Sequence, residues 1–325
     1  MKWIFPAVVL SLVSTVLGAP LQRRAAANDV ADIGYATLNG GPYLKALMWE
    51  LSRTTGGAGG AVTTVSTLAE LTAAVASDEP KVVFVSGTIT GSTSVRVGSN
   101  TSLLGQPGAT LNGVGLRVNG ESNVIIRNLK ITKVVAEAGD AIGIQSSSRV
   151  WVDHVDLSSD RDSGKDFYDG LLDITRGCTE ITVSFSRFSD HFKASLVGHS
   201  DNNEAQDRVM TVTYANNVFS NINSRTPSFR FGEGHIFNNL FEKNADGINT
   251  RLGAQLLVEN NVFSNCKKAI FSTDEGFAVA RGNEFGGATN TAPAGTLTDV
   301  PYDYTLVGAA NVRSAVSGAG ATLTF

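Results

Sequence analysis

Acidic side chains recur in the middle of the chain at spacings that could gather them on one surface. Asp140 stands alone, and Asp169 and Asp173 follow, four residues apart, in the next long polar segment. Three carboxylates supply hard oxygen ligands, of which Ca²⁺ takes about six to eight. Taken alone, three such residues more often form a solvated polar surface. The residue types alone therefore leave two hypotheses open, a cation site and an ordinary surface.

Basic residues follow the acidic ones along the chain. Lys193 lies in "DHFKASLVGHSDNN", and Arg225 and Arg230 lie in "RTPSFRFG". Any one of them is most simply explained as a surface cation. If successive turns of a repeated structure carried them in register, the three could line one groove beside the carboxylates. Such a groove would suit a polyanion that is bridged to the protein by a cation.

The element that would place these residues in register is a repeat. Six short segments alternate apolar with polar residues and then reach a polar residue next to an apolar pair. Aligning them puts the following residues at one position: Asn128, His154, Ser186, Asn217, Asn239 and Asn261. The later spacings are 22 residues, and no helical pattern of useful length lies between the segments. This self-similarity predicts a parallel β-helix in which stacked Asn side chains form a ladder.

The longer spacings, 32 and 31 residues around Ser186, predict loops that project from regular coils and carry function. The segment 66–76 is the one clear helix, with a capping box at Thr67 and Glu70. We expect it to cover the open end of the solenoid, which would otherwise be an exposed sheet edge. Cys178 and Cys266 would lie about three coils apart, which is too far for a disulfide.

The N-terminus has the pattern of a secretory signal peptide. Lys2 precedes a short apolar run, and small residues end it at 18–19, so we expect a signal peptide at 1–19 and a possible propeptide at 20–24. The remaining residues, 25–325, would form a single catalytic β-helix domain of a secreted, monomeric protein. Formal charge is −4, and removal of the three cations in 1–24 makes it about −7. That balance argues against nucleic acid as a partner.

Two local features carry separate predictions. Asn100 in "NTS" is the one N-x-S/T sequon and a glycosylation candidate. The segment "PYLKALMWELSR", 42–53, interrupts a Gly/Thr run that would otherwise read "NGGTTGGAGG". A misplaced exon boundary in the gene explains the interruption. A genuine surface helix also explains it, because Leu44, Leu47 and Leu51 keep helical spacing.

The ordered set of motifs resembles the fungal pectate lyases of polysaccharide lyase family 1, which fold as right-handed parallel β-helices. The resemblance covers nearly everything after residue 30. Its carriers are "GDAIGI", "VWVDH", "DGLLDITRG", "DHFKASLVGHSDNN", "RTPSFRFG" and "VPYDY". This chain has Phe192 where the family usually has Asp, which leaves Lys193 in place.

The resemblance implies a role for each of the candidate residues. Asp140, Asp169 and Asp173 match the Ca²⁺ ligands of the family. Arg225 matches the residue that is assigned as the base, and Lys193 and Arg230 match residues that bind substrate carboxylates. His191, His199 and Asp201 would shape their loop through hydrogen bonds to its backbone. Trp151, Asp153, His154 and His235 would be structural.

The implied reaction is β-elimination on polygalacturonate, in which a base removes H-5 and the glycosidic oxygen leaves C-4. Arginine is an awkward base because its guanidinium normally stays protonated, although neighbouring cations favour the neutral form. Three alternatives are a pectin lyase acting on methyl-esterified substrate, a polygalacturonase that hydrolyses with paired carboxylic acids, and a non-catalytic β-helix that binds carbohydrate. The carboxylates and Lys193 together favour the Ca²⁺-dependent pectate lyase.

Overall fold

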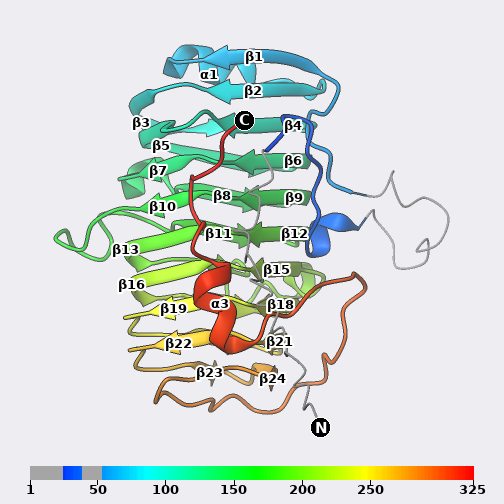
Figure 1. Ribbon diagram of the computed structural model, residues 1–325, viewed down its shortest axis with the longest axis vertical. Coiled ribbons are helices and arrows are strands. Elements are labelled where there is room, and N and C mark those ends of the chain that lie inside the picture. Colours follow the sequence, from blue (N-terminus) through cyan, green and yellow to red (C-terminus); the bar gives the residue numbers. More distant parts are fainter. Residues whose placement is uncertain (1–24, 39–52) are drawn as a thin grey trace, which may run out of the picture.

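The computed structural model describes residues 25–38 and 53–325, which form an elongated stack of parallel strands (Figure 1). Every strand pairing in the two sheets is parallel. The ten-stranded sheet contains β1 (Ala61–Val65), β2 (Lys81–Val85), β4 (Thr101–Gly105), β6 (Ser122–Arg127), β9 (Ser148–Asp153), β12 (Thr179–Ser184), β15 (Thr211–Ala215), β18 (Glu233–Phe237), β21 (Gln255–Glu259) and β24 (Phe277–Arg281). The predicted parallel β-helix is therefore confirmed.

The second sheet folds over on itself and supplies the other two walls. Its first row contains β7 (Lys130–Thr132), β10 (Asp156–Ser158), β13 (Arg187–Lys193), β16 (Val218–Ser224), β19 (Leu240–Glu242) and β22 (Val262–Ser264). Its second row contains β8 (Ile142–Gln145), β11 (Leu172–Thr175), β14 (Leu196–Val197), β17 (Ser228–Arg230), β20 (Ile248–Arg251) and β23 (Ile270–Thr273). The long strand β5 (Thr110–Asn119) pairs with both β7 and β8 and joins the rows, and β3 (Thr88–Arg96) pairs with β5.

Helices are short and lie outside the stack. They are the 3₁₀ turns η1 (Tyr35–Thr37) and η2 (Ala136–Ala138), and α1 (Leu68–Ala74), α2 (Glu204–Asp207) and α3 (Ala309–Ala315). The predicted capping box is present, since Thr67 accepts from the backbone of Glu70, and the Glu70 side chain accepts from the backbone of Thr67. In Figure 1, α1 lies at the end of the stack, beside β1 and β2, as expected for a cap.

The Asn ladder is present, but it differs from the aligned set at two positions. Ser186 Oγ accepts from the backbone N–H of Val155 at 3.2 Å, not from Asn128 or His154, and the Ser186 backbone N–H donates to Asn217 Oδ1 at 2.9 Å. The ladder then runs through Asn239 and Asn261 to Asn283. The side-chain Oδ1 of each accepts from the backbone N–H of the ladder Asn one coil earlier, at 2.8–2.9 Å. Asn283, which the alignment missed, therefore belongs to it.

Asn128 and His154 belong to the neighbouring column, which is one residue earlier in each coil. Strand register aligns them with these residues of later coils: Phe185, Asn216, Asn238 and Asn260. All six residues have φ between 44° and 59°, so this column is a continuous left-handed turn. Asn is the non-glycine residue that tolerates this conformation best, which explains why Asn recurs there. The alignment of Asn128 and His154 with Asn217 was therefore wrong by one position.

The interior of the stack is apolar and filled by residues from all three walls. Four buried rings form a file in the first row of the second sheet: Phe188, Phe219, Phe241 and Phe263. Successive ring centroids are 4.5, 5.1 and 4.6 Å apart, and their planes differ by 8–9°. Each ring buried in this way contributes about 1.5–3 kcal/mol relative to exposure. Cys178 and Cys266 are both unpaired, as predicted.

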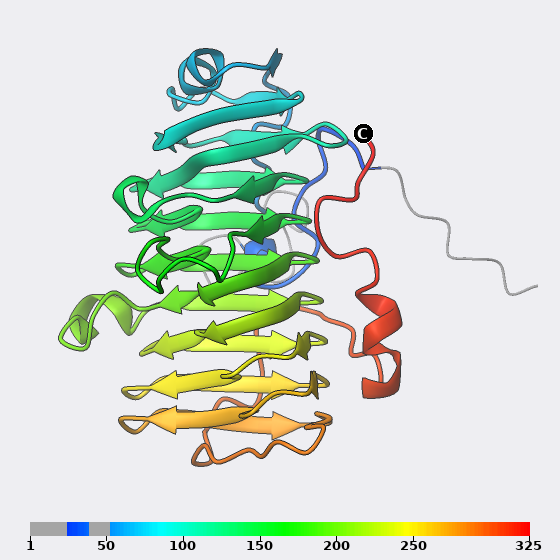
Figure 2. The ribbon, with the colours of Figure 1, turned by 90° about the vertical axis from the view of Figure 1, so that its left-hand side faces the viewer.

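The C-terminal segment runs back along the outside of the stack, next to the left-handed column (Figures 1 and 2). Asn238 and Asn260 hold it with bonds to the backbone of Thr305 and Val307, at 2.7–3.1 Å. Further along, Asn128 donates to the carbonyl of Leu323 and accepts from its N–H, at 3.0 and 2.8 Å. Side chains of α3 pack on the starts of β16, β19 and β22.

Candidate functional site

The candidate site forms where the chain turns from the first row of the second sheet into the second row. Three backbone bonds align four such turns: Ala141 N–H donates to Gly170 O at 3.0 Å, Leu171 N–H to Ala194 O at 3.0 Å, and Ser195 N–H to Arg225 O at 2.8 Å. Residues 140, 169–170, 193–194 and 225 therefore lie one above another on successive coils. The long loop between β10 and β11, which projects at the left of Figure 1, belongs to this column of turns.

Asp140 and Asp173 point to one place. A Cβ on Gly170 would lie 2.4 Å from Asp173 Oδ1 and 2.8 Å from Asp140 Oδ1. Both oxygens also accept backbone N–H bonds that fix them, from Leu196 to Asp173 at 2.9 Å and from Gly170 to Asp140 at 3.0 Å. Gly170 thus keeps open a small cradle between two carboxylates.

Asp169 lies in the same turn and is held differently. Its Oδ1 is 3.3 Å from Lys193 Nζ, and the same ammonium is 3.2 Å from Asp166 Oδ1. The side chain of Asp166 is 71% exposed, whereas the side chain of Lys193 is 16% exposed. No motif in the sequence points to Asp166, which is one of several acids in an exposed loop. Lys193 therefore bridges two acidic residues at the edge of the cradle.

The electrostatics of the cradle favour a cation. Burial, followed by the charges of Asp173 and Asp169, raises the pKa of Asp140 to about 9. Burial also raises the pKa of Asp173 to about 6, although Arg225, the Leu196 N–H and Lys193 act in the other direction. Carboxylates that raise one another's pKa in this way are stabilised in the charged form by a cation between them.

The three carboxylates are ligands of the kind that Ca²⁺ prefers, but they do not by themselves complete a coordination shell. Among residues 25–38 and 53–325, no three His, Cys, Asp or Glu side chains are already gathered as a metal site. Two carboxylates converge on the Gly170 cradle, and the third, Asp169, is paired with Lys193. Oxygen ligands that leave several positions to water and to a substrate acid suit Ca²⁺, which tolerates flexible coordination. The residues present therefore fit the expected ion.

Arg225 stands beside the cradle. Its Nη1 is 3.8 Å from Asp173 Oδ2, and its side chain is 31% exposed. Its backbone has φ of 62°, a left-handed conformation that a non-glycine residue with a long side chain rarely adopts. Left-handed non-glycine residues recur throughout this fold, so the conformation alone does not single out Arg225.

Arg230 lies on the same coil as Arg225, at the far end of β17. It ends β17, in register with Arg251 at the end of β20. Asp201 lies between them, 2.5 Å from Arg230 Nε and 3.3 Å from Arg251 Nη2. We expected Asp201 to bond its own loop, but its carboxylate instead orients Arg230. Arg230 Nη1 is buried and has no hydrogen-bond partner.

The two histidines of the segment 190–203, His191 and His199, make contacts outside that segment rather than to its own backbone as expected. His191 is 2% exposed; its Nδ1 lies 2.6 Å from Ser159 Oγ, and its Nε2 lies 2.6 Å from the carbonyl oxygen of Asp169. It therefore fixes the turn that carries Asp169. His199 contacts Arg176 at 3.3 Å, and its backbone N–H donates to Asp207. Phe192 faces the guanidinium of Arg161, 5.3 Å from the ring centroid.

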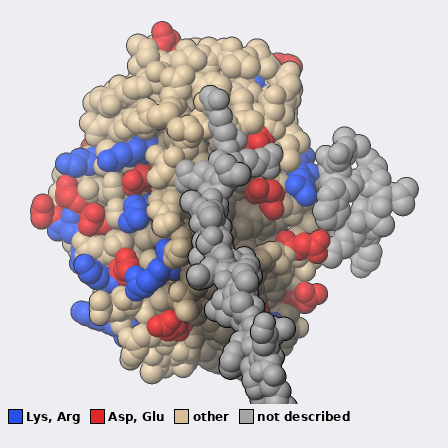
Figure 3. All heavy atoms as spheres, in the orientation of Figure 1, with Lys and Arg blue, Asp and Glu red and all other residues tan. Residues whose placement is uncertain are grey.

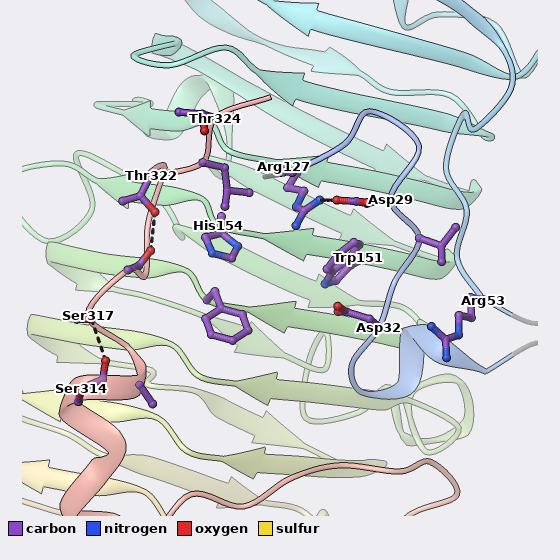
Figure 4. A pocket seen from close by; sticks show the side chains of 16 residues that line it. Asp29, Asp32, Arg53, Arg127, Trp151, His154, Ser314, Ser317, Thr322 and Thr324 are labelled. Atoms are coloured by element: carbon purple, nitrogen blue, oxygen red, sulfur yellow. Dashed lines mark hydrogen bonds and ion pairs between the residues drawn. The ribbon is translucent and has the colours of Figure 1, made fainter. Parts of the chain in front are cut away.

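A pocket lies elsewhere, between the N-terminal and C-terminal segments over β6 and β9 (Figure 4). Its volume is about 800 Å³, and Arg127, Trp151 and His154 line it. The residues beneath it bind coils together, as expected. Asp153, 1% exposed, lies 2.7 Å from Arg127 Nε, from His154 Nδ1 and from Ser184 Oγ. Trp151 Nε1 donates to the same Ser184 hydroxyl at 2.9 Å.

His235 is fully buried on the same sheet. Its ring nitrogens lie 2.7 Å from Tyr302 Oη and 3.1 Å from Glu259 Oε2, and Tyr304 donates to the same carboxylate oxygen at 2.9 Å. These contacts fasten "VPYDY" to the stack and are structural. The predictions for Lys193, Arg225 and the three Asp residues concern function, and the structure brings those five residues together around one turn column.

Comparison with known proteins identifies the family. The pectate lyase family profile matches residues 6–322. Pectate lyase A of Aspergillus niger is 55% identical over 333 residues, covering 100% of this chain and 99% of the relative. Pectate lyase A of Emericella nidulans is 57% identical over 316 residues, covering 96% and 93%. The chain belongs to the pectate lyase family.

A solved structure extends the comparison. The pectate lyase from Bacillus sp. N165, in complex with trigalacturonate, has a TM-score of 0.79 and 33% identity, covering 89% of this chain and 98% of that one. A thermostable pectate lyase, at 21% identity and a TM-score of 0.76, shares the fold. The enzyme described here is thus a lyase that acts on pectate, built on a parallel β-helix.

Proposed function

We propose that the enzyme cleaves (1→4)-α-D-galacturonan by Ca²⁺-dependent β-elimination and releases 4,5-unsaturated oligogalacturonides in plant cell-wall degradation. The observation that supports this is the convergence of Asp140 and Asp173 on Gly170, beside Arg225 and Lys193. Buried acids that border cations provide a place for a uronate carboxylate bridged to the protein by a metal ion. A neutral, methyl-esterified substrate would leave that arrangement without use.

Each residue has a role that its contacts support. Asp140, Asp169 and Asp173 would hold Ca²⁺, which when bound places positive charge against the substrate carboxylate and makes H-5 more acidic. The Lys193 ammonium lies 3.2–3.3 Å from one oxygen each of Asp166 and Asp169. A substrate carboxylate would take the place of one of these two acids beside the ammonium. Arg230, oriented by Asp201, offers a second guanidinium to the same polymer.

Arg225 would take the proton from C-5. The C5–H electron pair forms the C4–C5 double bond, and the C4–O bond breaks so that the glycosidic oxygen leaves with its electron pair and is then protonated. The reaction requires the neutral guanidine. Asp173 Oδ2 lies 3.8 Å from Arg225 Nη1, and Lys193 lies on the neighbouring coil.

The test is a rate assay that follows the ultraviolet absorbance of the new double bond on polygalacturonate. We expect activity that disappears in excess chelator and returns with added Ca²⁺, and little activity on highly esterified pectin. Full activity in chelator, or a preference for esterified pectin, would contradict the Ca²⁺-dependent assignment. Reducing ends without the absorbance would indicate hydrolysis.

We also propose secretion and one glycan. The signal peptide and propeptide, 1–24, lie outside the described residues. Within the described residues, no helix is long and apolar enough to cross a membrane. Asn100 is half-buried, its amide donates to the carbonyl of Asp78 at 3.0 Å, and Ser102 of its sequon is 1% exposed. A glycan would therefore have to be attached before folding. N-terminal sequencing and the mass before and after deglycosylation test both proposals.

A further inference from the structure

The column of turns that carries the candidate site continues for two coils beyond Arg225. Thr226 Oγ1 donates to the carbonyls of Asp246 and Gly247, both at 2.9 Å, and Ile248 N–H donates to the carbonyl of Ala269 at 2.8 Å. These bonds place Asp246 one coil beyond Arg225, and Lys268 two coils beyond it. At about 4.8 Å per coil, Lys268 lies about 10 Å from Arg225 along the stack.

The outer face of the second row also continues. Strand pairing puts five residues of successive coils in one outward column: Asp173, Leu196, Ser228, Asn249 and Phe271. Phe271 is the aromatic member, and it is half-buried rather than covered by the stack. Part of the Phe271 ring is therefore accessible at the outer face of the sheet.

Lys268 and Phe271 meet at this end of the face. Lys268 Nζ lies 4.2 Å from the centroid of the Phe271 ring and 3.0 Å from Asp246 Oδ1. The Lys268 side chain is 51% exposed. An ammonium has three donors, so the contacts with Asp246 and the ring leave hydrogen-bonding capacity directed to solvent. An exposed pair such as Lys268–Asp246 contributes little to stability, so stability alone gives it no evident purpose.

Figure 3 shows that basic and acidic side chains also lie close together over a larger part of this face. Lys and Arg alternate with Asp and Glu on the side where β10, β13 and β16 lie, whereas the coils around β1 and β2 carry few charges on this face. The charged strip thus follows the coils that carry the site and continues toward the C-terminal coils.

We propose that Lys268 and Phe271 bind a galacturonate unit of a long chain, two coils from Arg225. The proposal rests on the proposed function and adds a distal binding position to it. A sugar ring presents C–H groups on its faces, which stack on the Phe271 ring, while its carboxylate pairs with the Lys268 ammonium. Asp246 positions that ammonium over the ring. A chain long enough to span from Arg225 to Lys268 gains this contact, and a trimer at the reacting centre does not.

The test compares Lys268→Gln, Phe271→Ala and Phe271→Leu with the parent enzyme on polygalacturonate and on trigalacturonate. We expect KM for polygalacturonate to rise threefold to tenfold, with kcat within twofold of the parent enzyme, and KM for trigalacturonate to stay unchanged. Phe271→Leu keeps apolar volume without a flat ring, so we expect it to behave as Phe271→Ala does. Calorimetric titration with a hexamer should show weaker binding for the variants.

The matched control is Lys267→Gln, which removes the same charge from the adjacent, exposed position. It should leave KM unchanged on both substrates. An unchanged KM for polygalacturonate in Lys268→Gln overturns the proposal and leaves Lys268 as a cover for Phe271. An equal rise on both substrates, or the same rise in Lys267→Gln, also overturns it. If the parent enzyme shows no elimination at all, the proposed function fails instead, and hexamer binding still decides this proposal.

Discussion

At the scale of single residues, the cradle depends on a glycine as much as on its acids. Gly170 does not have a positive φ, so its backbone accepts alanine, but the added Cβ would lie 2.4 and 2.8 Å from the two carboxylate oxygens. We expect Gly170→Ala to lose at least tenfold in Ca²⁺ affinity while remaining folded. Isothermal titration and circular dichroism measure the two effects.

The control lies in the same loop. A Cβ at Gly164 meets nothing within 4 Å, so Gly164→Ala should titrate as the parent enzyme does. Normal Ca²⁺ binding by Gly170→Ala would show that the two carboxylates do not share an ion.

Arg225 separates catalysis from stability. Arg225→Lys keeps the charge but changes reach and geometry, and we expect turnover to fall at least a hundredfold with little change in thermal midpoint. Arg225→Gly also removes turnover, and it relieves a φ of 62°, so its midpoint should stay the same or rise. Rates on polygalacturonate and thermal scans decide both. Near-normal turnover in either variant would show that Arg225 is not the base.

The residue types and order of the site could be predicted from the sequence, whereas its detailed contacts could not. Asp140, Asp173 and Arg225 stand in recognisable motifs, and their coils had countable spacings. Asp201 was assigned to its loop because sequence gives no information on which side chain turns toward Arg230. Such pairings are decided by the path of a long loop over neighbouring coils.

At the scale of strands, one buried ionic group joins three coils. Asp153 of β9 reaches Arg127 of β6, and through Ser184 it reaches β12. Burial alone would raise the pKa of Asp153, but the His154 hydrogen bond and the charges of His154 and Arg127 outweigh it and leave the pKa below its usual value. The charged carboxylate is therefore favoured in the folded protein.

Asp153→Asn should lower the free energy of unfolding by roughly 3 kcal/mol at pH 7, because the buried Arg127 guanidinium loses one of its two carboxylate partners and keeps only Asp29. A folded-state pKa below the unfolded value of about 3.9 means that this contribution is present above that pH and is lost as pH falls through the folded pKa. The difference between parent and variant should therefore shrink below about pH 4. Denaturant titrations at pH 7 and pH 3.5 measure it, and a constant difference would count against the sign.

The repeat spacing in the sequence predicted the order of the strands correctly, but it predicted the positions of individual residues within each coil less well. Asn217, Asn239 and Asn261 were identified from their 22-residue spacing. Asn128 and His154 were placed one position too far along, because the left-handed column and the ladder are adjacent and both favour Asn. Phe185 occupies the left-handed position of the next coil, where sequence offers no reason to expect a ring.

At the scale of the whole molecule, the segment 42–53 lies outside the described residues except for Arg53. Its flanks are held together, since Thr54 N–H and Oγ1 both donate to Ala36 O at 2.9 Å. We expect deletion of 42–53 to leave lyase activity within twofold and the thermal midpoint unchanged or higher.

Arg53 needs its own control, because its charge lowers the pKa of Asp32 against the effect of burial. A deletion of 42–52 retains it and should be the more stable of the two. Failure of both deletions to fold would show that the segment is part of the structure, as would a tryptic peptide from it in the natural secreted enzyme.

The C-terminal segment that runs back along the stack has a consequence for the cooperativity of unfolding. A solenoid is a one-dimensional array in which each coil contacts its neighbours only, so its ends can melt before its middle. The C-terminal segment forms hydrogen bonds with Asn260, Asn238 and Asn128 in turn, and these bonds connect distant coils. Its removal, by ending the chain after Tyr304, should split a single calorimetric transition into two; one sharp transition in the truncated enzyme would show that the coils are coupled through their interfaces alone. Because these bonds need residues 305–323, the distant coils can be tied to one another only after that segment has been synthesised.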